Sequence, residues 1–198
     1  MMGFLSVIGA AHGWVRERVQ PGDAVIDATL GGGADARFLA ELVGPRGKLI
    51  GFDVQGDAIR RTEERLAPLG DSGKLPAVSL HLRSHAEMGM AVPDRDRGRI
   101  AAVLFNLGYL PGEGSDRSIV TQPASTLAAM EAAMELLRPG GVLACVLYPG
   151  HPGGEAEADA VLAWASALPS GRAQTVLYRM AQKRSAPYAL GIEKRQLT

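Results

Sequence analysis

Residues 23–33, with the sequence DAVIDATLGGG, decide how the rest of the chain is interpreted. The apolar residues of this stretch predict a short buried strand that ends beside an acid, Asp27. Three glycines follow at residues 31–33, and a helical pattern begins at Ala34. Glycine lets the backbone turn tightly and come close to a ligand. The stretch therefore predicts a strand-to-helix turn that can cradle a ligand, although a turn without a ligand would use the same residues.

Strand and helix patterns alternate along the rest of the chain. After a first helix that includes residues 16–18, apolar runs predict strands at residues 23–28, 48–53, 77–83, 100–106, 142–148, 173–180 and 188–194. Helical patterns lie between them at residues 34–43, 57–69, 121–137 and 155–168. The last two strands are joined by a loop of seven residues and are expected to be antiparallel. This order is typical of a doubly wound α/β sheet, in one domain across residues 1–198.

Composition excludes several classes of protein and of site. The 21 basic residues balance 21 acidic ones, so no overall charge attracts nucleic acid. No apolar run approaches the roughly 20 residues of a membrane span, and no membrane partner is expected. The single cysteine, Cys145, lies in an apolar run and predicts a reduced core thiol and a cytoplasmic location. The histidines and this cysteine match no zinc spacing, so no metal is expected.

Acids at strand ends indicate the kind of ligand. In a doubly wound sheet the ligand crevice lies at the carboxyl ends of the strands. Asp53 ends the second strand, where a carboxylate can accept hydrogen bonds from both hydroxyls of a ribose. Asp27 would repel a pyrophosphate and favours a positively charged group above the first turn. The pair favours S-adenosylmethionine over NAD, unless Asp27 only caps the next helix and Asp53 is only solvated.

A third motif follows the fourth strand, with the sequence NLGYLPG at residues 106–112. An amide carbonyl can hold an amine, and amino-methylating enzymes commonly place a polar residue, a spacer and an aromatic here. Asn106 and Tyr109 are therefore expected to orient a nucleophilic nitrogen, with a plain Gly-Pro loop as the alternative. His151, between glycines after the fifth strand, is the candidate proton acceptor.

Together these residues resemble the class I S-adenosylmethionine-dependent methyltransferases and, more narrowly, the rRNA methylase family. The likeness spans nearly the whole chain and rests on residues 27–33, 51–55, 106–111, 148–155 and 192–195. It implies a Rossmann-like class I fold with a mostly parallel seven-stranded sheet and an antiparallel last strand. It also implies methylation of the 5-aminomethyl group of the tRNA wobble uridine, often a 2-thiouridine. The expected partner is the anticodon region of tRNA. The resemblance is also compatible with a homodimer.

The motifs and the resemblance together define the expected site. His85 either flanks the adenine or caps a short helix. Catalysis is assigned to Asn106, Tyr109 and His151. The expected cofactor-binding residues are Asp27, Thr29, Gly31, Gly33, Asp53, Gln55, His85, Asn106 and Leu107, and the expected substrate-binding residues are Tyr109, Tyr148, His151, Lys183 and Arg184.

Departures from the family pattern concern the substrate more than the cofactor. Gly32 and Ala36 stand where the family usually has Asn and Thr, which the cofactor loop tolerates. Residues 181–187 keep only Gln182 and one proline of the family's Asn-Gln-x-Asn-x-Pro-Pro loop. The open alternatives are therefore an rRNA or small-molecule methyltransferase of the same fold, an NAD-binding oxidoreductase and a non-catalytic binding module.

Basic clusters suggest where RNA would lie. Lys183 and Arg184 sit in the loop between the last two strands and are expected at the carboxyl edge, beside the cofactor. Arg95, Arg97 and Arg99 precede the fourth strand and are expected at the opposite edge, as plain surface.

Overall fold

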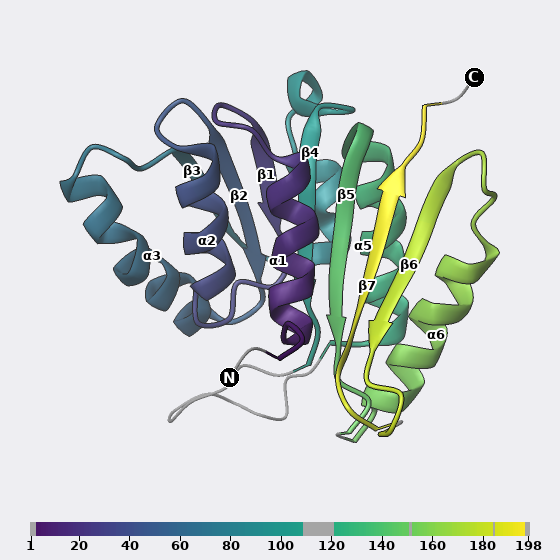
Figure 1. Ribbon diagram of the computed structural model, residues 1–198. Helices are drawn as coiled ribbons and strands as arrows, with labels where there is room; N and C mark the ends of the chain where they lie inside the picture. Colours follow the sequence, from purple (N-terminus) through teal and green to yellow (C-terminus); the bar gives the residue numbers. More distant parts are fainter. Residues whose placement is uncertain (1–2, 109–120, 151, 184, 197–198) are drawn as a thin grey trace.

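The computed structural model describes residues 3–108, 121–150, 152–183 and 185–196, and in this part of the chain seven strands form one sheet between two layers of helices (Figure 1). The strand order is β3-β2-β1-β4-β5-β7-β6. Neighbours among β1 to β5 are parallel, and β7 is antiparallel to both β5 and β6. The predicted doubly wound sheet with its antiparallel last strand is confirmed. The strands are β1 (Ala24–Asp27), β2 (Lys48–Asp53), β3 (Ala77–Leu82), β4 (Ile100–Asn106), β5 (Leu137–Leu147), β6 (Ala173–Arg179) and β7 (Tyr188–Lys194).

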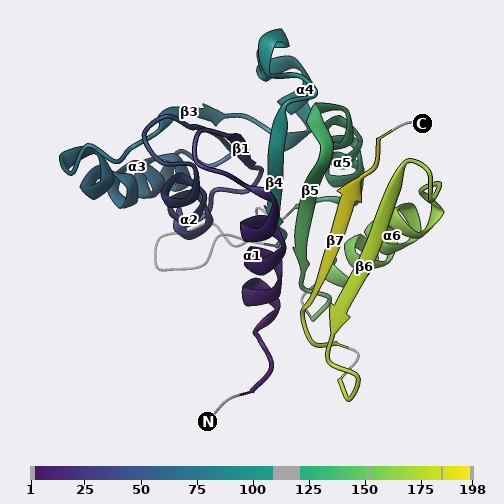
Figure 2. The same ribbon diagram turned by 45° about the horizontal axis from the view of Figure 1, so that its top comes forward.

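Helices cover both faces of the sheet (Figure 2). One layer holds α1 (Val7–Arg18), α2 (Ala34–Val43) and α3 (Gly56–Asp71), and the other holds α4 (Met88–Ala91), α5 (Pro123–Leu136) and α6 (Gly154–Ala167). Two short 3-10 helices, η1 (His85–Glu87) and η2 (Asp94–Asp96), flank α4. Because each layer buries one side of the sheet, side chains of β4 are buried on both faces. This explains the near-continuous apolar run of that strand.

The core contains the residues that the apolar patterns predict. Met130 and Met134 of α5 are buried against the sheet together with Phe105. Cys145 is fully buried in β5, as predicted, and burial raises the pKa of its thiol well above the ordinary value. A raised thiol pKa keeps the sulfur protonated, so it is a structural cysteine rather than a nucleophile.

Several boundaries differ from the sequence prediction by one or more residues, among them the starts of β5 and α3. β5 begins at Leu137 rather than at residue 142, because Leu137 still pairs with Ile100 across a bulge and Val142 then pairs with Ala102. Pro139, Gly140 and Gly141 therefore interrupt the ladder without ending it. Helix α3 begins at Gly56, one residue before the predicted start at Asp57, which lies in its first turn.

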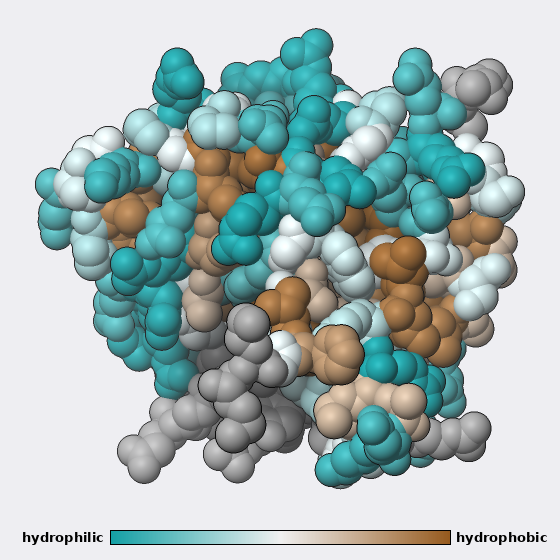
Figure 3. Space-filling model, in the orientation of Figure 1, coloured by the Kyte–Doolittle hydropathy of each residue, from teal (hydrophilic) through white to brown (hydrophobic). Residues whose placement is uncertain are grey.

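The surface on the α1–α3 side is mostly hydrophilic, with separate apolar patches (Figure 3). One patch lies over the edge strand β6. Val176 and Leu177 of this strand, whose side chains alternate between its two faces, are 44% and 42% exposed. Among the described residues, no helix is both long enough and apolar enough to cross a membrane.

Candidate active site

A cavity of about 1230 Å³ opens at the carboxyl ends of the strands, where a doubly wound sheet binds its ligands. Its walls come from the segments that follow β1, β2, β3, β4 and β5, and from the loop before β7. Eight of the predicted site residues line it: Thr29, Gly31, Asp53, Gln55, His85, Asn106, Leu107 and Tyr148. Tyr109, His151 and Arg184 lie outside the described residues.

Asp53 ties the glycine loop to the loop after β2. Its Oδ2 accepts a hydrogen bond from the Gly31 N–H at 3.0 Å, and its Oδ1 accepts one from the Gln55 N–H at 2.9 Å. Asp53 is therefore not merely solvated. A carboxylate has about four lone-pair positions, so each oxygen can still accept a ribose hydroxyl.

Asp27 supports the turn from behind the cavity wall. It is fully buried, its Oδ1 accepts from the Thr29 N–H at 3.1 Å, and its Oδ2 has no hydrogen-bond partner within the described part of the chain. Burial raises the pKa of this carboxyl well above its ordinary range, and the charge of Asp35 adds to the rise. Asp27 is absent from the cavity lining, so its contact with a ligand stays a prediction, whereas Asp35, Asp53 and Glu64 do line the cavity.

Gly33 is also absent from the cavity lining, and its role is one of packing. Its φ of 74° is in the left-handed region that favours glycine. A Cβ added there would lie 2.8 Å from the Cα of Thr62 on α3. Gly33 therefore allows α2 to begin directly against α3, and its contact with the cofactor stays a prediction.

His85 lies in the cavity wall. The residue as a whole is 8% exposed. The Nε2 of its ring is buried and has no hydrogen-bond partner among the residues that the structure describes. The short helix is capped by Ser84, whose Oγ accepts from the Ala86 N–H at 3.2 Å, so the capping alternative for His85 is wrong. Burial lowers the pKa of the His85 imidazole and keeps it neutral. The residue lines the cavity, and the expectation that it flanks the adenine stays a prediction.

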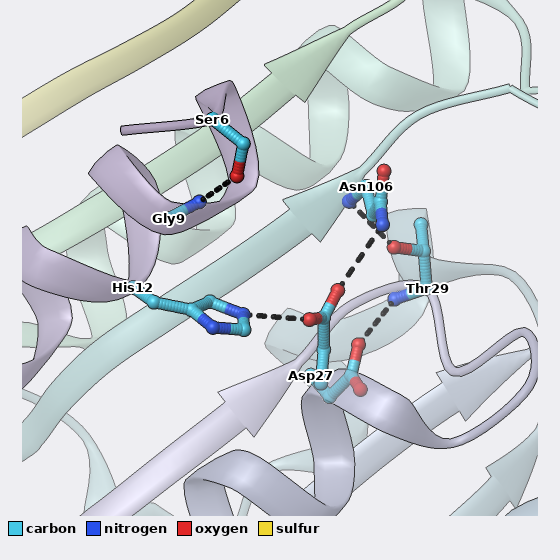
Figure 4. A network of polar contacts seen from close by, with 7 residues as sticks. Ser6, Gly9, His12, Asp27, Thr29 and Asn106 are labelled. Atoms are coloured by element: carbon cyan, nitrogen blue, oxygen red, sulfur yellow. Dashed lines mark hydrogen bonds and ion pairs between the residues drawn. The ribbon is translucent and has the colours of Figure 1, made fainter. Parts of the chain in front are cut away.

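Asn106 is fixed by two contacts at the end of β4. Its backbone N–H donates to Thr29 Oγ1 at 2.8 Å, and its Nδ2 donates to Asp35 Oδ2 at 3.2 Å. The other oxygen of Asp35 lies 2.7 Å from the Nε2 of His12. Figure 4 shows His12 and Asn106 directed toward one another across this carboxylate. The amide oxygen of Asn106 stays available to accept an N–H from an acceptor amine.

The sequence motifs missed both Asp35 and His12. Asp35 stands two residues after the glycines, and this position in the first turn of α2 is the signal that was available. His12 has no such signal, because 23 residues separate it from Asp35.

A buried acid anchors the segment that follows Asn106. Glu157 of α6 is 2% exposed and accepts hydrogen bonds from Thr121 at 2.6 Å and Thr126 at 2.7 Å. The Thr121 hydroxyl oxygen in turn accepts from the Gly108 N–H at 3.0 Å. This chain of contacts fixes Gly108 beside the cavity, and no sequence motif had indicated it.

Basic residues occupy both edges of the sheet. Lys183 is exposed in the loop between β6 and β7, and Ser185 of the same loop lines the cavity, so the loop lies at the carboxyl edge as predicted. The cluster at residues 95–99 precedes β4 and lies at the opposite edge, also as predicted. Three further arginines, which the sequence reading did not select, line the cavity from α2 and α3: Arg37, Arg61 and Arg65.

In the ranges that the structure describes, no group of three or more His, Cys, Asp or Glu residues is arranged to hold a metal ion.

Comparison with known proteins identifies the family. The family model "Putative rRNA methylase" matches residues 49–193. A relative from Arabidopsis thaliana, "tRNA (mnm(5)s(2)U34)-methyltransferase, chloroplastic", is 38% identical over 191 residues, which cover 94% of this chain and 68% of that protein. The chain belongs to the rRNA methylase family.

Solved structures of two bacterial proteins agree with this assignment. An rRNA-methylase of Clostridium thermocellum superposes with a TM-score of 0.88 at 34% identity, over 98% of this chain and 100% of that one. A methyltransferase of Streptococcus mutans, solved in complex with SAH, superposes with a TM-score of 0.82 at 34% identity, over 97% and 99%. The predicted class I fold and the S-adenosylmethionine-dependent methyltransferase activity of this rRNA methylase family member are confirmed.

Proposed function

We propose that the protein methylates the 5-aminomethyl nitrogen of the wobble uridine in tRNA, including its 2-thiolated form. The observation that carries the proposal is the similarity to the Arabidopsis tRNA methyltransferase across 94% of this chain. The acceptor in this proposal is an alkylamine on a base of the anticodon, which must reach the cavity unstacked from its neighbours.

Residues on the β2 and β3 side of the cavity fit the cofactor. Asp53 has lone pairs for the ribose hydroxyls, and His85 lies in the part of the wall proposed for the adenine. The backbone at Gly31 and Gly32 is open to the cavity for the amino-acid part. When bound, S-adenosylmethionine supplies an electrophilic methyl group on a sulfonium.

Residues on the β4 and β5 side fit the acceptor. Asn106 presents an amide oxygen to the amine, and Tyr148 offers an aromatic ring to the base. Direct displacement needs no covalent intermediate with the protein. The contribution of these residues is therefore to hold the nitrogen in line with the methyl group.

Replacing Asp53 by alanine is expected to weaken binding of S-adenosylmethionine and S-adenosylhomocysteine by about 1–3 kcal/mol, or roughly 5- to 150-fold in Kd. The loss includes the ribose contacts and the tie between the two loops. Isothermal titration calorimetry measures it. Asp57→Ala is the control, because Asp57 is a partly exposed acid in the first turn of α3 and is absent from the cavity lining. Binding of NADH, with neither sulfur compound bound, would contradict the cofactor assignment.

The acceptor is tested by mass spectrometry of nucleosides after incubation with S-adenosylmethionine. Undermodified tRNA that carries the 5-aminomethyl group is expected to gain one methyl group on that nitrogen. Equal methylation of the free nucleoside would move the function to a small-molecule methyltransferase. Methylation of small-subunit rRNA in place of tRNA would establish the ribosomal alternative.

Charge reversal at the carboxyl edge tests RNA contact. Lys183→Glu combined with Arg184→Glu is expected to raise the KM for tRNA several-fold and to leave the Kd for S-adenosylmethionine unchanged, because phosphate contacts add electrostatic affinity without touching the cofactor. The matched control is Arg95→Glu with Arg99→Glu, two exposed arginines at the opposite edge. An equal effect of both pairs would show a general charge effect and no local contact.

The homodimer and the cytoplasmic location stay predictions. Analytical ultracentrifugation of the purified chain measures the first, and fractionation of cells measures the second.

A further inference from the structure

His12 and Asp35 form a pair that leads from the cavity toward the protein surface. The Nε2 of His12 lies 2.7 Å from Oδ1 of Asp35, and Asp35 lines the cavity. The side chain of Asp35 is 9% exposed and that of His12 is 20% exposed. The more buried acid thus faces the reaction space, and the more exposed imidazole stands behind it.

The pair lies on the acceptor side of the cavity. Asp35 accepts a hydrogen bond from the Nδ2 of Asn106, the residue that ends β4 (Figure 4). It is also close enough to Tyr148 for its charge to raise the pKa of that phenol, in addition to burial, which is the larger cause. The residues assigned to the ribose and adenine, Asp53 and His85, follow β2 and β3 instead.

The proposed acceptor creates a need for such a pair. Alkylammonium groups such as that of lysine have pKa values near 10.4, so an aminomethyl group is mostly protonated at neutral pH. A protonated nitrogen has no lone pair with which to attack a methyl group. The site must therefore remove one proton and carry it away from the reacting nitrogen.

We propose that Asp35 takes a proton from the acceptor ammonium and that His12 carries this proton to solvent, an inference that rests on the proposed function. The N–H bond breaks, its electron pair stays on nitrogen, and the proton binds an oxygen of Asp35. The proton then passes to the lone pair of the His12 Nε2, in the tautomer whose own proton is on Nδ1, and the resulting imidazolium releases its Nδ1 proton to water. The nitrogen pair forms the new N–C bond as the C–S bond breaks, with that bond's electrons remaining on sulfur.

Packing holds the imidazole in place for this transfer. The ring of His12 stacks on Phe38 of α2, with the centroids 3.8 Å apart and the planes 6° apart. The guanidinium of Arg16 lies 5.2 Å from the same phenyl ring. The charged and titratable groups around the pair are Arg16 on α1, Arg37 on α2, Asp27 on β1, Asp53 on β2 and Tyr148 after β5.

Three variants separate proton transfer from simple positioning. Asp35→Asn keeps the shape and removes the base. His12→Gln offers Asp35 an amide hydrogen-bond partner that cannot take up a proton, and His12→Ala removes the partner altogether. Glu17→Gln is the matched control, since Glu17 is an exposed acid on α1 whose side chain is 67% exposed. Turnover on tRNA is measured between pH 6 and pH 9.5, with calorimetry of S-adenosylhomocysteine for each variant.

Asp35→Asn is expected to lower kcat at neutral pH by about 10²- to 10⁴-fold, the usual contribution of a general base. Both His12 variants are expected to lose roughly 10-fold or more, because proton release is impaired. In all three, kcat should rise about tenfold per pH unit and approach the wild-type value at alkaline pH, where solvent itself deprotonates the amine. The Kd for S-adenosylhomocysteine and the activity of Glu17→Gln should not change.

Several results would overturn the inference and leave the proposed function intact. If His12→Gln kept the wild-type dependence of kcat on pH, His12 would be a positioning residue. If the loss of kcat in Asp35→Asn did not recover at alkaline pH, Asp35 would be a positioning residue as well. A large rise in the Kd for S-adenosylhomocysteine with unchanged kcat would place Asp35 on the cofactor. Only a wild-type protein that methylates no amine would overturn both the function and the inference.

Discussion

Replacing Asn106 by alanine is expected to lower turnover on tRNA by about 10²- to 10³-fold while the Kd for S-adenosylmethionine changes little. The backbone contact of Asn106 with Thr29 survives the substitution, so the end of β4 keeps its place. The amide oxygen that would hold the amine is lost, together with the hydrogen bond to Asp35. Steady-state kinetics and calorimetry together measure the two effects.

The control for this variant is Gln174→Ala, which removes an exposed amide on the edge strand β6, far along the sheet from β4. It should leave both quantities unchanged. An Asn106→Ala protein with normal turnover and weakened cofactor binding would move Asn106 from the acceptor to the cofactor. Whether the variant changes kcat or Kd therefore decides whether Asn106 contacts the acceptor or the cofactor.

Gly33→Ala is expected to destabilise the fold by about 2–4 kcal/mol, whereas Gly32→Ala should be nearly neutral. The φ of 74° at Gly33 strains any residue that has a Cβ, and the new Cβ would lie 2.8 Å from the Thr62 backbone. Gly32 has a φ outside the left-handed region and open space around it. Urea unfolding of the two variants gives the difference.

This comparison also separates packing from ligand contact. The destabilisation by Gly33→Ala should be present without any cofactor, because the clash is between α2 and α3. If Gly33→Ala unfolded at the wild-type urea concentration but lost affinity for S-adenosylmethionine, Gly33 would be a cofactor residue as the motif suggested.

Local sequence patterns determined the strand and helix order and one edge of the site. Continuous apolar runs identify strands buried on two faces, as in residues 100–105, and the polar residue that ends such a run must lie at the carboxyl edge. Asp53 and Asn106 were found in this way, and both line the cavity. The activity was inferred from the resemblance to the family, because composition and charge do not indicate it.

Only the tertiary structure decided which side chains meet at that edge. The contact of His12 with Asp35 spans 23 residues and that of Glu157 with Thr121 spans 36, and both depend on how separate helices pack against the sheet. Periodicity shows which face of a helix is buried, but it carries no information on which element lies opposite. For the same reason, the sequence could place Asp27 and Gly33 in the first turn but could not show that one lies behind the cavity wall and the other against Thr62.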